Sequence, residues 1–275
     1  MSRDALFVAY KPSNISSNQF LGRLKRKYNI KKAGYSGTLD PFAKGVLIVA
    51  FGKYTSLFRF LNKTPKSYRA TLWLGAKSDS LDIEMVESIE KIDELRLEKM
   101  EHAIQSLVGN LTYHPPIFSA KRIDGRRAYD LAREGKEVVL NTIESTIYSA
   151  KLTNYSHPFV TFEVTVSEGT YVRSLGKMIA ENLGVKHGSL SALERLCEGN
   201  FKYQSERKLD IRESLNIPQN SYSGDKQGVL LGHKLDLAHF TNKDNGYCWV
   251  DFDEFISIFE IAEDSVKYIL NRIYL

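Results

Sequence analysis

The sequence contains few cysteines and no long apolar run. Only two of its 275 residues are cysteine, Cys197 and Cys248, and they lie far apart. Zinc sites and disulfide frameworks need paired or closely spaced cysteines, so the sequence indicates neither, and we expect a reducing environment. No apolar run approaches the length that crosses a bilayer, and the apolar stretch near the N-terminus is too short for a secretory signal and stops at Lys11. We therefore expect a cytoplasmic protein that does not contact membranes.

The common signatures of nucleotide, metal and serine chemistry are also missing. The glycines at positions 34, 37 and 45 fit neither the dinucleotide fingerprint nor the phosphate-binding loop. The six histidines form no cluster with the spacing of metal ligands, and no Gly-x-Ser-x-Gly elbow is present. We therefore expect a function that needs no cofactor and no metal.

Acidic residues are scarce in the first 60 positions. This segment holds eleven Lys or Arg but only two acids, Asp4 and Asp40, whereas residues 241–275 hold three bases and seven acids. The whole chain has a net charge of +5. Such asymmetry favours a basic face that binds nucleic acid. The alternative is a solvated lysine-rich helix, since residues 23–27 have a helical pattern.

Asp40 is a lone carboxylate within this basic part of the chain. It lies in a glycine-containing segment, residues 34–47, and an apolar run follows at residues 46–51. An Asp-Pro pair commonly starts a turn, because proline pushes the preceding residue out of helical dihedrals. The other interpretation is that a polyanion is brought to the carboxylate for chemistry. The segment by itself leaves both interpretations open.

The hydrophobic pattern predicts strands and helices in irregular alternation. Strands are expected at residues 6–10, 67–74 and 159–166, and helices at about 17–28, 55–61, 97–107, 128–134, 172–183 and 189–196. Residues 79–94 are acidic and are expected to form a loop. The irregular alternation indicates an α+β protein rather than a βαβ repeat.

The character of the sequence changes near residue 208. Residues 221–228 are polar and contain glycine, and the apolar runs at 247–252 and 255–261 suggest a small β-rich appendage. We therefore expect a large domain, residues 1–207, followed by a small C-terminal module, residues 208–275.

Three further features qualify as candidates for chemistry. Tyr68 begins a predicted strand, where a tyrosine is commonly a core or cross-strand aromatic. Arg173 begins a predicted helix, where an arginine is usually a surface residue. Residues 115–127 mix prolines, aromatics and bases, and a solvated surface loop is the simpler interpretation. The reactive groups are thus one carboxylate, one phenol and one guanidinium beside a basic surface.

Motifs around these residues, in their order along the chain, resemble those of the TruB family of tRNA pseudouridine synthases. The resemblance runs from Lys11-Pro12 to about Gly199. Five motifs carry it: residues 34–41 with Gly45-Val46-Leu47; Lys66-Ser67-Tyr68-Arg69 with Leu74-Gly75, Asp79 and Asp82; the insertion motif of residues 115–135; Ser167-x-Gly169-Thr170-Tyr171-x-Arg173-Ser174; and Leu193-x-Arg195-Leu196. Five motifs at sensible spacing are specific enough to set chance similarity aside.

The resemblance implies a pseudouridine-synthase fold, with a mixed, mainly antiparallel central sheet flanked by helices and loops. It implies an RNA-gripping insertion at about residues 112–137. It further implies isomerisation of uridine 55 in the TΨC arm of tRNA. Asp40 would be the nucleophile, Arg173 would hold that carboxylate ionised through a single or bidentate contact, and Tyr68 would stack on the base and move a proton. The family needs no cofactor or metal. We also expect a monomer with tRNA as its partner and no obligate protein partner.

The resemblance also implies a set of substrate contacts. Leu193 would form an apolar wall against the uracil, and Tyr35, where the family often has histidine, would fill the gap left by the flipped base. The other expected contacts are Lys11, Asp82, Lys121, Arg122, Arg126 and Arg127. Ser56 stands where the family often has lysine, which removes one phosphate contact. The C-terminal module matches the family's RNA-binding module poorly, so we expect a reduced RNA-binding domain there.

Two other functions stay open on sequence alone. One is a non-catalytic protein that binds or folds tRNA. The other is a related synthase with a different RNA target or a guide-RNA partner, although such relatives usually carry a fuller C-terminal RNA-binding domain. Conversion of uridine in a tRNA transcript by the purified protein would separate the first alternative from an enzyme.

Overall fold

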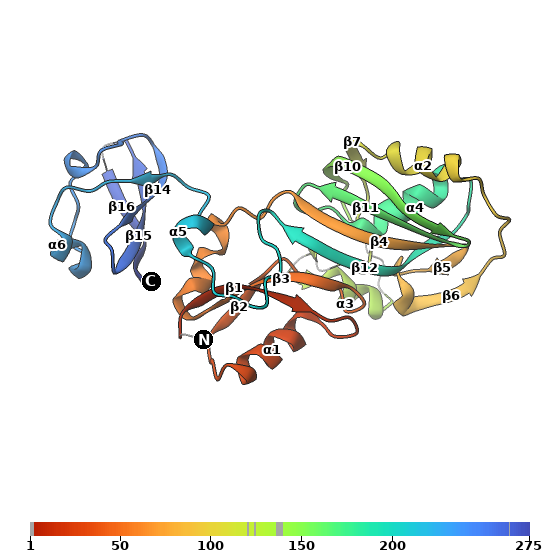
Figure 1. Ribbon diagram of the computed structural model, residues 1–275, viewed down its shortest axis with the longest axis horizontal. Coiled ribbons are helices and arrows are strands. Elements are labelled where there is room, and N and C mark those ends of the chain that lie inside the picture. Colours follow the sequence, from red (N-terminus) through yellow and green to blue (C-terminus); the bar gives the residue numbers. More distant parts are fainter. Residues whose placement is uncertain (1–2, 120, 124, 136–139, 264) are drawn as a thin grey trace.

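A mixed sheet of eight strands forms the body of the molecule (Figure 1). The computed structural model describes residues 3–119, 121–123, 125–135, 140–263 and 265–275, with only the backbone for residues 122, 123, 127, 129, 132 and 133. The strand order is β1-β3-β12-β4-β11-β10-β7, with β2 paired to β3, and only the β12–β3 pair is parallel. The strands are β1 (Ala5–Lys11), β2 (Ala33–Ser36), β3 (Lys44–Phe51), β4 (Lys66–Leu74), β7 (Gly109–Tyr113), β10 (Ile143–Ser156), β11 (Phe159–Val166) and β12 (Gly188–Glu198).

Strands β1 and β3 are mostly apolar because both of their faces are buried over residues 5–9 and 46–51. They pair from Ala5 opposite Phe51 to Lys11 opposite Gly45. Alternate side chains of a strand point to opposite faces, so Leu6 and Val8 enter one hydrophobic cluster while Phe7 enters another. The apolar run at residues 46–51 is therefore part of a central strand.

Strand β4 has one buried face and one polar face. Lys66, Tyr68 and Ala70 are buried on the first face. On the other face, Ser67 and Thr71 pair through their hydroxyl groups with threonines of β11, at 2.9 and 3.0 Å. The alternation of β4 thus turns Tyr68 away from the polar face and towards the interior.

Strand β12 contradicts the helix expected at residues 189–196. The Leu, Ala, Glu and Arg residues of that segment have high helix propensity. The segment nevertheless pairs with β4 along one edge, where Leu193 lies opposite Ala70 and Arg195 opposite Tyr68, and with β3 along the other. Pairing on both edges satisfies its backbone groups in a buried position, and this outweighs the local propensity. Leu193 and Arg195 consequently point from the same face of a strand.

Three of the helices lie where the sequence placed them. Helix α1 (Ser17–Lys27) begins after Ser16, which forms a capping box with Gln19. Helices α2 (Leu97–Gln105) and α4 (Val172–Asn182) bury their apolar sides in the cluster formed with β4 and β11. In the part of the chain that the structure describes, no helix is both long and apolar enough to cross a bilayer.

Two other segments differ from the expectation. The helix expected at residues 55–61 is a 3₁₀ helix, η1 (Gly52–Phe60). The segment expected to be a loop, residues 79–94, contains η2 (Ile83–Met85) and β6 (Val86–Ile89). Strand β6 forms because β5 (Ala76–Ser78) offers it an antiparallel partner, which the acidic sequence does not reveal.

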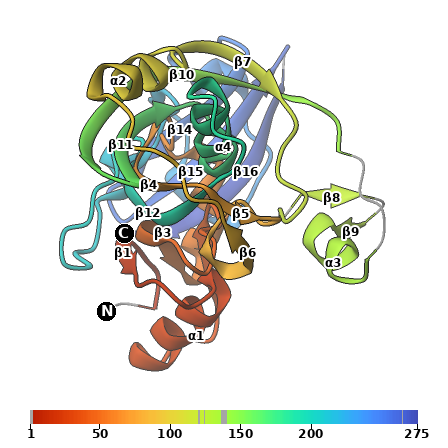
Figure 2. The same cartoon turned by 90° about the vertical axis from the view of Figure 1, so that its right-hand side faces the viewer.

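The expected insertion leaves the body of the molecule as an arm (Figure 2). It contains the two-stranded sheet of β8 (Arg122–Ile123) and β9 (Arg126–Arg127), followed by α3 (Ala128–Arg133). The sequence predicted this helix at residues 128–134. Lys121, next to β8, also lines the cleft described below.

The C-terminal strands form a second sheet, as expected. Its order is β13-β14-β15-β16, and the bounds are β13 (Gln219–Asn220), β14 (Gly246–Asp251), β15 (Phe255–Ala262) and β16 (Ser265–Tyr274), with α5 (Ile211–Ser214), α6 (Lys226–Leu231) and η3 (Leu237–His239) around it. Trp249 and Ile258 of this sheet share one apolar cluster with Leu6 and Leu57. The two sheets therefore share a core, and the domain boundary at residue 207 or 208 stays a prediction.

Candidate active site

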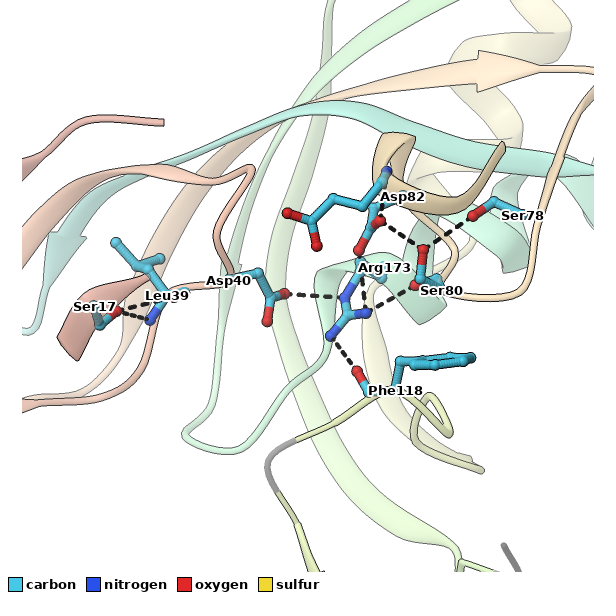
Figure 3. Close-up of polar contacts among 9 residues, drawn as sticks. Ser17, Leu39, Asp40, Ser78, Ser80, Asp82, Phe118 and Arg173 are labelled. Carbon is cyan, nitrogen blue, oxygen red and sulfur yellow. Dashed lines mark hydrogen bonds and ion pairs between the residues drawn. The ribbon is translucent and has the colours of Figure 1, made fainter. Parts of the chain in front are cut away.

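The loop that carries Asp40 joins β2 to β3, and Ser17 of helix α1 holds it in place. Ser17 Oγ donates to the Leu39 carbonyl oxygen at 2.9 Å and accepts from the Leu39 N–H at 3.0 Å (Figure 3). The Asp40 carbonyl accepts from the Ala43 N–H at 3.1 Å. The backbone of Asp40 therefore makes the turn that Asp-Pro predicts, while its side chain points elsewhere, towards Arg173.

Lys11 supports the same loop from the end of β1. Its side chain is fully buried, and Nζ donates to the carbonyl oxygens of Pro12, Ile15 and Pro41 at 2.9, 2.7 and 3.3 Å. Burial lowers the pKa of Lys11 to about 8, although the nearby Asp40 carboxylate acts in the opposite direction. The structure thus gives Lys11 a position that supports the loop, as an enclosed ammonium bonded to three carbonyls, and its expected contact with the substrate stays a prediction.

Arg173 lies in the first turn of α4 and is nearly enclosed, with 5% of its side chain exposed. Its Nε forms an ion pair with Asp40 Oδ2 at 3.0 Å. Nη1 donates to the Ser80 carbonyl at 2.8 Å and lies 3.3 Å from Asp82 Oδ2, and Nη2 donates to the Phe118 carbonyl at 2.9 Å. The contact with Asp40 is therefore single rather than bidentate, because the other guanidinium nitrogens are directed at other partners.

Asp82 holds Arg173 and does not face the cleft. Its side chain is 2% exposed. Oδ1 accepts from Ser80 Oγ at 2.6 Å and from the Glu84 N–H at 3.0 Å, and Oδ2 faces Arg173 (Figure 3). One oxygen of Asp82 thus faces the guanidinium and the other is held by Ser80 and Glu84, so the structure gives Asp82 a supporting position behind Arg173, and its expected contact with the substrate stays a prediction.

The environment of Asp40 opposes the ionisation of its carboxyl group. Desolvation raises the pKa of Asp40 above its usual value, the Arg173 cation lowers it, Asp82 raises it further, and Lys11 lowers it. The side chain still exposes 35% of its surface, on the side of the cleft. Asp40 is thus a reachable carboxylate in a partly dry site, and Arg173 is the strongest group favouring its charged form.

The cleft beside Asp40 has a volume of about 510 Å³, which suits a small organic group such as a nucleobase. Tyr68 and Leu193, both buried, form part of its lining together with Asp40 and Arg173. Lys121, from the stem of the arm, also lines it. The structure therefore brings together the carboxylate, the phenol, the guanidinium and the apolar wall that the sequence proposed from four separate motifs.

Tyr35 and Arg126 are not among the residues that line this cleft. Tyr35, on β2, donates its hydroxyl hydrogen to Asn18 Oδ1 at 3.1 Å. Arg126 is exposed on the arm and pairs with Glu134. The side chains of Arg122 and Arg127 lie outside the part of the chain that the structure describes. For these four residues the predicted contact with RNA stays a prediction.

Several residues of the site were not identified from sequence. Ser80 and the Phe118 carbonyl hold Arg173, Ser17 holds the Asp40 loop, and Lys66 lines the cleft. A serine or a backbone carbonyl gives no signal in one sequence, because its function depends on which distant segment folds against it. Within the described ranges, no three His, Cys, Asp or Glu residues lie close enough together to hold a metal ion.

Comparison with known proteins adds independent information. A family model described as "TruB family pseudouridylate synthase (N terminal domain)" matches residues 25–172. The tRNA pseudouridine synthase B of Sulfurimonas denitrificans is 60% identical over 268 residues, which span 98% of each chain. The proteins of the same name from a Sulfurovum species and Campylobacter jejuni are 55% and 47% identical, over 98% of this chain and 96% and 98% of theirs.

Solved structures match over both sheets. A chain in the crystal structure of a Cbf5–Nop10–Gar1 complex matches with a TM-score of 0.68 at 18% identity, covering 99% of this chain and 84% of the other. A chain in an archaeal box H/ACA Nop10–Cbf5 complex matches with a TM-score of 0.65 at 19% identity, covering 99% and 86%. At such identities the match shows a shared fold and nothing more.

Proposed function

The chain belongs to the TruB family of pseudouridylate synthases, and from this premise we propose that it converts uridine 55 in the TΨC arm of tRNA to pseudouridine, with Asp40 as the nucleophile. It is an isomerase that acts on tRNA, and its fold is the expected α+β pseudouridine-synthase fold. The single observation that supports the mechanism best is the 3.0 Å pair between Asp40 and Arg173 in a cleft that Tyr68 and Leu193 also line.

The reaction needs few groups because it is an internal rearrangement. The bond between N1 of uracil and C1′ of ribose breaks, and a bond from C5 to C1′ forms. The proton leaves C5, and a proton is bound at N1, so the product is an isomer and no electrons are exchanged with another molecule. A carboxylate that adds to the nucleotide and then leaves is sufficient as a covalent catalyst.

Asp40 performs the addition, at C6 of the base or at C1′ of the sugar. Both routes require the ionised carboxylate. Arg173 favours that form, and its remaining contacts keep the guanidinium from turning away. A charge held in fixed geometry in a closed site stabilises a transition state more than a mobile one does.

Tyr68 stacks on the target base and moves the proton that leaves C5. Substitution Tyr68→Phe keeps the ring and removes the hydroxyl. The expected result is a conversion rate lower by about 10²- to 10⁴-fold, the usual contribution of general acid–base catalysis, with the Kd for tRNA changed less than about threefold. Single-turnover conversion and filter binding measure the two quantities. Tyr148→Phe, an exposed tyrosine outside the cleft lining, is the control and should react like the wild type.

Extrusion of the base requires contacts that hold the RNA around the cleft. Breaking the stacking of one nucleotide costs a few kcal/mol, which stacking and phosphate contacts offset. We assign the phosphate contacts to Lys121 at the cleft and to Arg122, Arg126 and Arg127 on the arm. Tyr35 fills the space that the extruded base leaves, and Leu193 contacts the uracil.

The position of the target is tested with two transcripts. Purified protein should convert one uridine, at position 55, in an unmodified tRNA transcript, and none in a matched transcript with cytidine at position 55. Chemical mapping of pseudouridine gives the position. Conversion elsewhere in the tRNA would leave the family assignment intact and reject the proposed target.

We further propose that the protein acts as a cytoplasmic monomer without an obligate protein partner. In this proposal residues 1–207 are the catalytic domain and residues 208–275 are a reduced RNA-binding module.

A further inference from the structure

A buried ion cluster lies at the base of the Asp40 loop, and no step described above uses it. Glu198, at the end of β12, is fully buried. Its Oε1 lies 3.5 Å from Lys66 Nζ, and its Oε2 lies 3.4 Å from Arg195 Nη2. The Lys66 and Arg195 side chains expose only 8% and 1% of their surface. A fully buried carboxylate is unusual unless it is paired and serves a purpose.

The cluster contacts both ends of the loop that carries Asp40. At the incoming end, Ser36 Oγ donates to Glu198 Oε1 at 2.9 Å, and Arg195 Nη2 donates to the Gly37 carbonyl at 3.0 Å. At the outgoing end, Arg195 Nε donates to the Val46 carbonyl at 2.8 Å. The cluster thus joins the two strands from which the loop projects.

Gly37 shows how closely the loop lies on the cluster. A Cβ at this position would lie 3.1 Å from Glu198 Oε1 and from Arg195 Nη1, and 3.3 Å from Lys66 Nζ. The φ angle of Gly37 is +63°, in the region that favours glycine. The backbone therefore passes directly over the three charged groups, three residues before Asp40.

We propose that Glu198 is a positioning residue for Asp40, acting through Ser36 and Arg195. The proposal rests on the assignment of Asp40 as the nucleophile. Glu198 holds the incoming strand end directly through Ser36, and it orients Arg195, which holds both ends. Lys11 and Ser17 hold the middle of the loop, so Glu198 supplies the support that they lack.

A simpler interpretation is that the cluster only stabilises the sheet. A buried ion pair is weak evidence for stability, since apolar residues of similar volume often do as well. Its contacts at the loop point to geometry instead. A displacement of about 1 Å at a reacting group can lower a rate about 100-fold without a change in binding.

The decisive variant is Ser36→Ala, which keeps every charge of the cluster and removes only the direct hydrogen bond between Glu198 and the incoming strand end. The conversion rate in single turnover should fall about 10- to 100-fold, the range for losing a hydrogen bond to a charged group. The Kd for tRNA should change less than about threefold, because most contacts with RNA are made to phosphates outside the cleft. Ser36→Thr keeps the hydroxyl and suits a strand, so it should restore the rate to within about threefold of the wild type. Ser67→Ala, which removes a hydroxyl pair from the opposite face of the same sheet, is the matched control.

Glu198→Gln provides a second measurement, with Glu163→Gln on the exposed pair with Arg69 as its control. Glu198→Gln should lower the rate at least as much as Ser36→Ala, at a temperature where thermal unfolding shows both proteins folded. Adding Ser36→Ala to Glu198→Gln should lower the rate less than about twofold more. The reason is that Ser36 acts only through its bond to the Glu198 carboxylate, which Glu198→Gln has already weakened. Wild-type rates in Ser36→Ala, or independent effects in the double variant, would overturn the proposal. Conversion at the wild-type rate by Asp40→Asn would instead overturn the proposed nucleophile, so the two failures are distinguishable.

Discussion

Substitution Asp40→Asn is expected to abolish pseudouridine formation while tRNA binding persists. Removing the nucleophile of an enzyme commonly lowers its rate by about 10⁴- to 10⁶-fold. Asparagine has the same shape, but its amide does not form the covalent bond. The Kd for tRNA should stay within about threefold of the wild-type value, because most contacts with RNA are made to phosphates outside the cleft. Pseudouridine mapping after overnight incubation and filter binding measure the two effects.

The same substitution should leave the fold intact. Desolvation raises the pKa of Asp40, so the folded state binds the proton of this group more tightly than the unfolded state. A group with a raised pKa contributes stability below its unfolded pKa and loses it as the pH rises through the folded value. Ionisation of this carboxyl group therefore costs folding free energy, and Asp40→Asn, whose side chain is neutral, should not lower the Tm. Asp244→Asn, at an exposed position outside the cleft, is the control for activity and Tm.

This result also decides between an enzyme that needs Asp40 and a protein whose cellular task is tRNA binding alone. Cells that carry Asp40→Asn should lack pseudouridine at the target position. If they nevertheless show every growth property of the wild type, the binding task is the one that matters to the cell. If the purified variant converts tRNA at the wild-type rate, Asp40 is not the nucleophile.

The candidate catalytic residues could be predicted from sequence, whereas the residues that hold them in place could not. Asp40, Tyr68, Arg173 and Leu193 stand in local motifs whose residue types are chemically distinctive, and the structure brings them into one cleft. Glu198 and Ser36 have no such signal. Their pairing joins β12 to β2, and only the complete sheet places them together. Chemistry is thus readable from short motifs, whereas positioning depends on long-range packing.

The differences between the sequence analysis and the structure also arise from long-range packing. The segment of β12 has a strong local preference for helix, and pairing on both edges overrides it. Lys11 and Asp82 carry charges typical of substrate contacts, yet both are buried and bonded to other groups of the site. Local propensity and residue type do not show whether a charge faces the solvent or the interior. Burial, which follows from the tertiary fold, separates these two cases.

The second large effect is expected from Arg173. Substitution Arg173→Lys keeps a positive charge but loses the planar group that reaches Asp40, Ser80 and Phe118 together. The conversion rate should fall by about 10²- to 10³-fold, the usual effect of removing one preorganised group that stabilises charge. Arg69→Lys, on the exposed pair with Glu163, is the matched control and should react at the wild-type rate.

Arg173→Ala tests the electrostatic part of the argument through pH. Arg173 lowers the pKa of Asp40, while desolvation and Asp82 raise it. Removing the guanidinium should therefore raise the pKa of Asp40 further. The acid limb of the pH–rate profile should therefore move to higher pH, and the variant should recover part of its rate as the pH is raised. Added guanidinium ion should also restore part of the rate and move the limb back. The variant also leaves the buried Asp82 without its cation, which typically destabilises a protein by about 3–5 kcal/mol, so the profile must be measured below its lowered Tm. An acid limb at the wild-type pH would show that Arg173 orients the site without controlling the charge of Asp40.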